Sequence, residues 1–519
     1  MWPIFILVIT LFGWLVPETS SGSVSFCPTG CICNDETLVV QCEKSKLDVV
    51  PITLNPQIQR LILKNNKIRT VDAAFQFYGD LQYVDLSSNH LMSMSKTMFD
   101  NQKKLQELHL NKNHIAVITN ITFQGLKSLT VLNLRENYLE QLTEKLFSIL
   151  PRLEELNLGQ NRITSIDPLA FDGLNSLRVL YLDDNQLSIV PTAAFKPLGS
   201  LAELHVGLNG FSELNNGAFS DLEKLSVLNL LSAGLVNISE GAFSGLSGLR
   251  TLDLTDNRLT SIPTKQLAEL PRLEELAIGQ NEFTSIKPDS FKGLSNLRKI
   301  DITGAGQLER IEAGAFASNL NLETVILANN RKLSQIDDGA LAGLPKLHRL
   351  LLRDNSLTTL SEGSASWGDI RGLELTDIPL ECTCDLLWLR NILAMKNLTT
   401  VQCAGPQAVR DRQMRSLLPE EMGCAFNDPR QQAILGALCV SGVALLAGLS
   451  LTLYRYRRNV RDVVKDYKWN KRAISRKEHE YQKTFSEDEY MVRAAAAAAA
   501  HHQNHPHLAP VKQIPVTEL

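Results

Sequence analysis

The sequence predicts an α/β solenoid, in which copies of one short unit stack into a curved rod with a parallel β-sheet on its concave face. Two observations predict it. The phrase L-x-x-L-x-L-x-x-N-x-L occurs thirteen times between Ile58 and Leu357, almost always 24 residues apart. A second phrase, A-F-x-G-L and its relatives, recurs in the same register. One such unit cannot bury its apolar face alone, so the copies must stack.

Alternation inside the repeat predicts where each side chain points. The L-x-L part indicates a strand whose leucines face the core while the intervening residues face outward. The asparagine comes where the chain leaves the strand, and its amide can satisfy buried backbone groups in that bend. This position is filled by Asn66, Asn89, Asn113, Asn137, Asn161, Asn185, Asn209, Ala233, Asn257, Asn281, Ala305, Asn330 and Asn355.

Three copies depart from the pattern. Ala233 and Ala305 have no amide, and the copies that contain Ala305 and Asn330 each carry one extra residue. We expect local irregularity there. The alternative is that these copies have lost the repeat pattern without gaining any function.

The phrase and its period are those of the leucine-rich repeat, whose stacked copies form a horseshoe. A horseshoe presents a long concave surface suited to binding another macromolecule. We expect about 13 repeats over residues 57–368. The phenylalanines of the second phrase should form the convex half of the core: Phe123, Phe171, Phe195, Phe219, Phe243, Phe291 and Phe316.

The chain opens with an apolar run from Met1 to Val16, followed by small residues up to Gly22. This pattern predicts a secretory signal peptide over residues 1–22, although its start lacks Lys and Arg.

Eight of the nine cysteines form two clusters that bracket the repeats: Cys27, Cys31, Cys33 and Cys42, then Cys382, Cys384, Cys403 and Cys424. Even numbers in an exported chain predict disulfides. Zinc is the alternative, but no histidine accompanies either cluster.

The clusters resemble the cysteine-rich caps that flank extracellular leucine-rich repeats, here at 23–56 and 369–425. The resemblance implies the pairs Cys27–Cys33, Cys31–Cys42, Cys382–Cys403 and Cys384–Cys424. Such caps keep the terminal repeats from exposing their apolar core. Asp377-Ile-Pro-Leu380 replaces the usual Asn-Pro-Trp phrase, so we expect Leu380 to cover the core and Leu386–Arg390 to form the cap helix.

Residues 433–454 carry no charge and are long enough to cross a bilayer as one helix. Eight Lys and Arg residues follow by Arg472, and a basic flank marks the cytoplasmic side. The sequence thus predicts a single-pass type I protein of the plasma membrane, with its N-terminus extracellular. Residues 455–519 are polar and expected to be disordered. The terminal Thr517-x-Leu519 fits the groove of a PDZ adaptor.

Three N-glycosylation sequons, at Asn120, Asn237 and Asn397, fall outside the predicted concave strands. The outward strand positions are where a ligand is expected. An apolar and aromatic patch stands there among acidic and polar residues, and we assign the ligand face to Val179, Tyr181, Glu203, His205, Val227 and Leu231. A merely solvated sheet is the alternative.

The caps, repeats, single span and short tail resemble cell-surface leucine-rich repeat adhesion proteins. The tail phrases Lys465–Arg472 and Ile514–Leu519 resemble those of the insect Tartan and Capricious pair. The resemblance implies cell–cell recognition or the patterning of neurites and boundaries, through homophilic or heterophilic contact. The alternative is a co-receptor that captures a secreted ligand and modulates signalling in the same membrane.

We find no paired catalytic carboxylates, nucleophile motif or phosphate loop in the sequence, so an enzyme, a cofactor and a bound metal are not expected. The formal net charge of −4 does not suggest a nucleic-acid partner.

Overall fold

The structure is a computed structural model that describes residues 26–71, 73–96, 98–424 and 429–481. The chain divides into two compact units, Met1–Ala425 and Phe426–Leu519. The expected signal peptide and the tail residues Thr517 and Leu519 lie outside the described residues.

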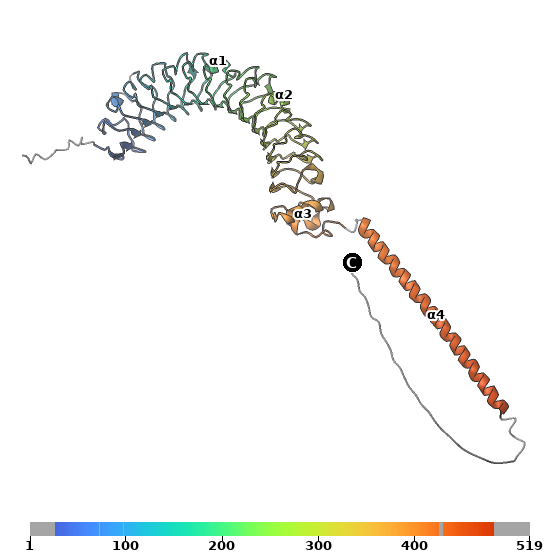
Figure 1. Cartoon of the computed structure of the whole chain (residues 1–519). Helices are drawn as coiled ribbons and strands as arrows, with labels where there is room; N and C mark the ends of the chain where they lie inside the picture. Colours follow the sequence, from blue (N-terminus) through green and yellow to red (C-terminus); the bar gives the residue numbers. More distant parts are fainter. Residues whose placement is uncertain (1–25, 72, 97, 425–428, 482–519) are drawn as a thin grey trace, which may run out of the picture. The chain divides into compact units, whose positions relative to one another are not determined.

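The first unit is a curved solenoid whose inner side carries one 16-stranded sheet (Figure 1). Strands β1 and β2 form an antiparallel pair, and the other fourteen strands run parallel, one in each turn of the solenoid. The predicted leucine-rich repeat horseshoe is therefore confirmed. In order, the strands are β1 (Ile32–Asn34), β2 (Val39–Gln41), β3 (Arg60–Ile62), β4 (Tyr83–Asp85), β5 (Glu107–His109), β6 (Val131–Asn133), β8 (Glu155–Asn157), β10 (Val179–Tyr181), β11 (Glu203–His205), β13 (Val227–Asn229), β15 (Thr251–Asp253), β16 (Glu275–Ala277), β18 (Lys299–Asp301), β20 (Thr324–Ile326), β22 (Arg349–Leu351) and β23 (Gly372–Glu374).

The last strand, β23, falls beyond residue 368, where the repeats were expected to end. It pairs with β22 in parallel, and Leu373 and Leu375 are buried like the leucines of the other strands. The alternation of the repeat thus continues for one more turn than the sequence phrase indicates.

Short elements make up the rest of the solenoid. The small parallel sheets join β7 (Gln141–Leu142) to β9 (Ser165–Ile166), β12 (Glu213–Leu214) to β14 (Asn237–Ile238), and β17 (Ser285–Ile286) through β19 (Arg310–Ile311) to β21 (Gln335–Ile336). Helices α1 (Thr192–Phe195) and α2 (Thr264–Leu267) lie on the outer side of the arc (Figure 1). The 3-10 turns are Ala73–Phe77, Glu362–Ser364, Cys384–Leu386, Gln407–Val409 and Met414–Ser416.

The core lies between the sheet and the outer turns. Every phenylalanine assigned to the convex half of the core is fully buried. Neighbouring rings stack at repeat spacing, with centroids 6.3 Å apart for Phe123 and Phe147 and again for Phe147 and Phe171. The rings therefore bind one turn of the solenoid to the next.

The asparagines join consecutive turns through the backbone. Asn161 Nδ2 donates to the carbonyls of Leu134 and Leu158, each at 3.0 Å, and its Oδ1 accepts from Leu139 N at 3.1 Å. The residue before it, Gln160, has a φ of 52°, in the left-handed region. The amide thus stabilises a strained bend by satisfying buried backbone groups on both sides of it.

The irregularity expected near Ala305 is present in this hydrogen-bond pattern. In the regular turns, Oδ1 accepts from the N–H two residues beyond the preceding asparagine position. Asn330 Oδ1 instead accepts from Ala305 N at 2.7 Å, and Asn355 Oδ1 accepts from Asn330 N at 3.0 Å. The extra residue in each copy accounts for the shift. The sheet itself continues without interruption past both Ala233 and Ala305.

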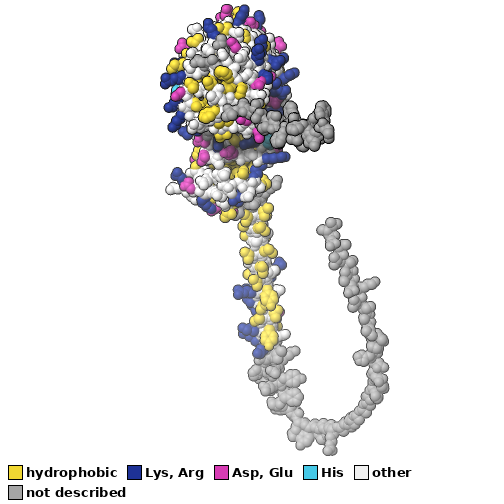
Figure 2. All heavy atoms as spheres, turned by 90° about the vertical axis from the view of Figure 1, so that its left-hand side faces the viewer, with side chains coloured by type: hydrophobic (Ala, Val, Ile, Leu, Met, Phe, Trp, Pro, Cys, Tyr) yellow, Lys and Arg dark blue, Asp and Glu magenta, His cyan; other side chains and the backbone are white. Residues whose placement is uncertain are grey.

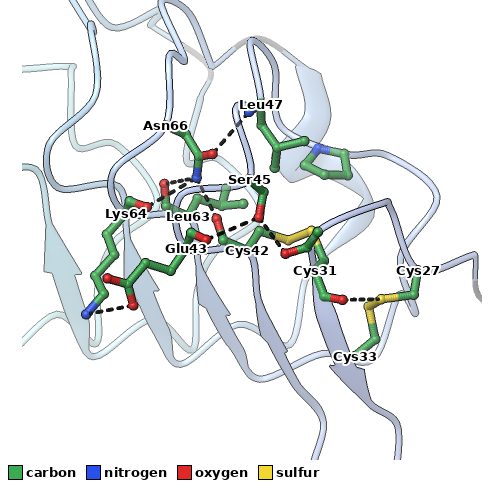
Figure 3. Close-up of a disulfide and its surroundings, with 12 residues drawn as sticks. Cys27, Cys31, Cys33, Cys42, Glu43, Ser45, Leu47, Leu63, Lys64 and Asn66 are labelled. Atoms are coloured by element: carbon green, nitrogen blue, oxygen red, sulfur yellow. Dashed lines mark hydrogen bonds and ion pairs between the residues drawn. A yellow bond between two sulfur atoms is a disulfide. The ribbon is translucent and has the colours of Figure 1, made fainter.

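Disulfides lie near both ends of the solenoid, at Cys27–Cys33, Cys31–Cys42, Cys382–Cys403 and Cys384–Cys424. In the N-terminal cap, the first asparagine of the ladder reaches back beside the disulfides (Figure 3). Asn66 Nδ2 donates to Cys42 O at 2.6 Å, and Asn66 Oδ1 accepts from Leu47 N at 3.0 Å. This cap therefore continues the bonding pattern of the repeats.

The C-terminal cap closes the other end of the core. Leu380 is fully buried, as expected of the residue that stands where tryptophan is usual. Helix α3 (Leu387–Met395) follows Cys384, and its Trp388 packs against Trp367, with ring centroids 5.4 Å apart.

The second unit contains helix α4 (Pro429–Tyr481). It is the one helix among the described residues that is long and apolar enough to cross a membrane. The helix continues through residues 455–481, which differs from the disorder expected from 455 onward. The sequence has no glycine or proline from Leu449 to Tyr481, so no residue there interrupts a helix that the span begins.

Candidate protein-binding site on the concave face

The parallel register aligns the outward residues of neighbouring turns. Across β10, β11 and β13, Tyr181 is level with His205 and then with Asn229. All six residues of the predicted ligand face are partly exposed, while the leucines between them are buried. The strands thus present these side chains to solvent on a rigid surface.

A hollow of about 420 Å³ opens on this face. It brings together three of the six predicted residues, Tyr181, His205 and Leu231, whereas Val179, Glu203 and Val227 lie in the adjoining column of the sheet. Its full lining is Arg135, Asn157, Tyr181, Asp183, His205, Gly207, Leu208, Asn229 and Leu231.

An ion pair that the sequence interpretation missed forms one wall. Arg135 Nη1 donates to Asp183 Oδ2 at 2.8 Å, although the two residues belong to turns that are not neighbours. Between them stands Gly159, where a Cβ would lie 2.7 Å from Asp183 Oδ1. Because the glycine has no side chain, the ion pair can cross the intervening turn. In the sequence, a glycine at this outward position of the repeat was the signal that could have indicated the ion pair.

Tyr181 and His205 form the aromatic part of the hollow. Their ring centroids are 4.6 Å apart and their planes differ by 17°, so the rings are stacked. Burial raises the pKa of the Tyr181 phenol, and the carboxylates of Glu155, Glu203 and Asp183 raise it further, while Arg135 opposes them. A phenol with the ordinary pKa of 10.0 is already neutral at physiological pH, so Tyr181, whose pKa is raised, can donate a hydrogen bond there.

The charge of the concave face is unbalanced around this hollow. The nine neighbouring strands of the 16-stranded sheet from β4 to β16 (β4, β5, β6, β8, β10, β11, β13, β15 and β16) define this region, together with the two residues that follow each strand. The only cation in this set is Arg135, which is already paired. The carboxylates number seven: Asp85, Glu107, Glu155, Asp183, Glu203, Asp253 and Glu275. The middle of the concave face is therefore acidic.

Two further aromatic groups went unassigned in the sequence. Near the N-terminal end of the sheet, Tyr83 lies 5.2 Å from His109 and 4.0 Å from the Arg60 guanidinium, measured to the ring centroid in both cases. Burial, followed by the charge of Asp85, raises the pKa of Tyr83.

The other group lies along one flank of the solenoid, where each member directly follows an asparagine of the ladder. His90, His114 and Tyr138 form a stack with centroids 5.6 and 5.4 Å apart, and Arg162 lies 4.3 Å over the Tyr138 ring. In the sequence, the aromatic and basic residues that directly follow the asparagines were the signal that could have revealed this group.

The three sequon asparagines are exposed and lie outside the 16-stranded sheet. Asn237 belongs to β14, where its Nδ2 donates to Glu213 Oε1 at 2.8 Å. Asn397 follows α3, and Asn120 lies in the turn region after β5. None of the three lines the hollow.

The chain belongs to the leucine-rich repeat family. The family's model matches overlapping stretches that run from residue 79 to residue 367, more than half of the chain.

Among curated relatives, Reticulon-4 receptor-like 2 of Homo sapiens is 36% identical over 87 residues, which are 17% of this chain and 20% of the relative. The protein of the same name from Rattus norvegicus is 33% identical over 134 residues, covering 21% of this chain and 30% of the relative. The chain thus matches less than a third of the length of these relatives.

Two solved structures share the architecture. A TLR13–ssRNA13 complex superposes with a TM-score of 0.52 at 26% identity, covering 67% of this chain and 48% of the other. An LRIM1/APL1C complex gives a TM-score of 0.54 at 19% identity, covering 87% of this chain and 82% of the other, and shows a common fold.

Proposed function

We propose that this chain is a cell-surface recognition receptor that binds a protein partner through the concave face, with the hollow around Tyr181 at the centre of the interface. The observation that carries the proposal is the stacked, partly exposed pair of Tyr181 and His205 in a hollow of a rigid sheet. Tyrosine is enriched among the residues that dominate binding energy, and such residues sit in pockets near the centre of an interface.

The charge of the face indicates the chemistry of the partner. Seven carboxylates around one paired arginine favour a surface rich in Lys and Arg. The same charge disfavours a nucleic acid, because phosphates would be repelled. We therefore do not extend to this chain the RNA found in the TLR13 complex. Leu231 and the apolar edge of Tyr181 would contact the alkyl stems of such basic side chains.

Adhesion between cells is the role we infer for this receptor, in the manner of the adhesion proteins that its caps and tail resemble, the Tartan and Capricious pair included. The relatives named receptor-like support a receptor role. In this proposal residues 1–22 direct export, 433–454 span the plasma membrane, and glycans on Asn120, Asn237 and Asn397 leave the concave face open. Thr517 and Leu519 would engage a PDZ adaptor inside the cell. The second candidate is a co-receptor for a secreted ligand, for which the same hollow would serve.

Mixed-cell aggregation tests the proposal with the full chain. Labelled expressing cells are mixed with non-expressing cells, and the Tyr181→Ala variant is compared with the wild type at equal surface level. Loss of a central aromatic side chain commonly costs about 2 kcal/mol or more of binding energy, so aggregation should fall steeply. Tyr138→Ala, which removes a tyrosine from the flank, is the matched control.

Each outcome separates the candidates. Aggregates of expressing cells alone indicate homophilic adhesion, and mixed aggregates indicate a heterophilic partner. Absence of aggregation together with capture of a secreted protein favours the co-receptor. Equal aggregation by wild type and Tyr181→Ala would place the interface elsewhere.

A further inference from the structure

The part of α4 beyond the apolar segment carries a narrow apolar stripe. Six residues recur at alternating spacings of four and three residues, and five of the six are apolar or aromatic. They are Tyr456, Val460, Val463, Tyr467, Asn470 and Ile474. The other 14 positions from 455 to 474 include all ten charged residues of the stretch. The first four stripe residues are 69, 42, 67 and 70% exposed, so they are not covered by any part of the chain that the structure describes. Figure 2 shows hydrophobic side chains continuing down the helix beside the basic ones.

The width of the stripe distinguishes its possible partners. At about 100° per residue, its apolar members fall within an arc of about 60°, while the exposed Val464 and Trp469 lie outside it. A helix that lies flat on a membrane presents a wide apolar face, whereas a stripe with a period of 3.5 residues is the seam of a coiled coil. The helix also runs on from the apolar segment without a glycine or proline at which it could turn into the membrane plane.

The flanking charges fit a second copy in parallel. With Val460 and Tyr467 at heptad position a and Val463 at position d, Asp466 falls at position g and Lys471 at position e of the next heptad. In a parallel pair these two positions face each other across the seam, so each Asp466 would meet the Lys471 of the other copy. Two copies inserted in one membrane in the same direction are necessarily parallel.

We propose that residues 456–474 of α4 bind the same segment of a second copy of this chain as a parallel two-stranded coiled coil. The Asp466–Lys471 pairs favour the parallel orientation. The proposal concerns α4 alone and stands whether or not the concave face binds a partner. It would hold two solenoids on one membrane and so double the number of binding faces.

Disulfide cross-linking in isolated membranes tests the seam. Cys439 is the one free cysteine, and its exchange for serine gives a background in which single cysteines can be introduced. Full-length chains with Val460→Cys, Val463→Cys or Tyr467→Cys should form dimers at least about fivefold more readily than chains with Arg461→Cys, Lys465→Cys or Lys468→Cys, whose positions face away from the seam. Equal yields at seam and outer positions would overturn the proposal.

Charge exchange supplies a second, independent readout. Asp466→Lys should reduce cross-linking through Val463→Cys several-fold, because two lysines then face each other, and Lys471→Asp should do the same. The double exchange should restore the yield. If neither exchange alters it, or if seam cysteines fail to cross-link and are shielded from a water-soluble maleimide by anionic lipid, the stripe faces a membrane and the coiled coil is refuted.

Discussion

Two groups of concave strands differ in what their last residue does. In β4, β6, β8, β13, β15 and β18 this residue is Asn or Asp, and its side-chain oxygen accepts a hydrogen bond of 2.9–3.1 Å from the backbone N–H two residues on. In β10 and β11 it is Tyr181 and His205, which stack on each other instead. Six strands of the face thus use a polar side chain to support their own backbone, and β10 and β11, which lie between them, do not.

The difference teaches where recognition is to be sought. An Asn or Asp that serves the local turn has part of its hydrogen-bonding capacity already used. A stacked tyrosine and histidine satisfy no nearby backbone group, so they are retained for some other purpose or are dispensable. The hollow and the crossing ion pair occur at this place, which favours the first explanation.

The largest effect is expected at Leu182, the residue directly after β10, and is compared with the same change at Tyr181, the last residue of β10. Leu182 is fully buried, so Leu182→Arg would place an unpaired charge in the core and should destabilise the solenoid by more than about 4 kcal/mol. Tyr181→Arg introduces the same side chain one residue earlier, on the outward side. Cell-surface level and thermal unfolding measure both: the first variant should be retained inside the cell and the second displayed. Display of both at wild-type level would contradict the assignment of inward and outward positions.

Two glycines at outward positions of the sheet allow effects on the stability of the solenoid to be distinguished from effects on partner binding. A Cβ on Gly279 would lie 2.7 Å from Thr303 N and collide with its carbonyl oxygen, whereas a Cβ on Gly159 meets the movable ends of Arg135 and Asp183. Gly279→Ala should therefore cost about 1–3 kcal/mol of stability. Gly159→Ala should cost less but displace the ion pair and weaken partner binding.

Thermal unfolding and the aggregation assay measure the two glycine variants side by side. An equal loss of stability, with binding unchanged in Gly159→Ala, would remove the ion pair from the site.

Removal of one hydrogen bond between a side chain and the backbone tests the group of strands that end in Asn or Asp. Asp253 Oδ1 accepts from Thr255 N at 2.9 Å, and Asp253 does not line the hollow. Asp253→Ala should lower stability by about 1 kcal/mol, because the hydrogen bond is lost, while partner binding stays close to wild type. Asp253→Asn keeps an acceptor oxygen and should restore stability. A larger effect on binding than that of Tyr181→Ala would reverse the roles assigned to the two groups.

Repetition explains how much of this structure the sequence predicts. The spacing of Leu156 and Leu158 recurs in every turn, so the parallel sheet, its register and the outward position of Tyr181 follow from the period alone. The Arg135–Asp183 pair does not, because its members are 48 residues apart and meet only since Gly159 between them has no side chain. The fourteenth strand, β23, was missed because Ile378 replaces the asparagine of its repeat, although the apolar positions of the phrase are kept.

The smallest effect expected is an electrostatic one at Tyr181. Burial, helped by Glu155, Glu203 and Asp183, raises its pKa above the ordinary value of 10.0. The folded state therefore favours the neutral phenol. The stabilisation that results is fully present below pH 10 and is lost as pH rises through the higher pKa of the folded protein.

Difference absorbance between the wild type and Tyr181→Phe during an alkaline titration follows the ionisation of this one phenol. Its midpoint should lie above that of a free tyrosine. Glu203→Gln should lower the midpoint by removing a carboxylate, and Arg135→Met should raise it by removing the opposing cation. Binding should persist at mildly alkaline pH and weaken only where the phenolate forms, because the phenolate can no longer donate a hydrogen bond. A midpoint at or below 10, or a midpoint that neither neighbouring substitution moves, would mean that Tyr181 is more exposed than the stacked arrangement with His205 requires.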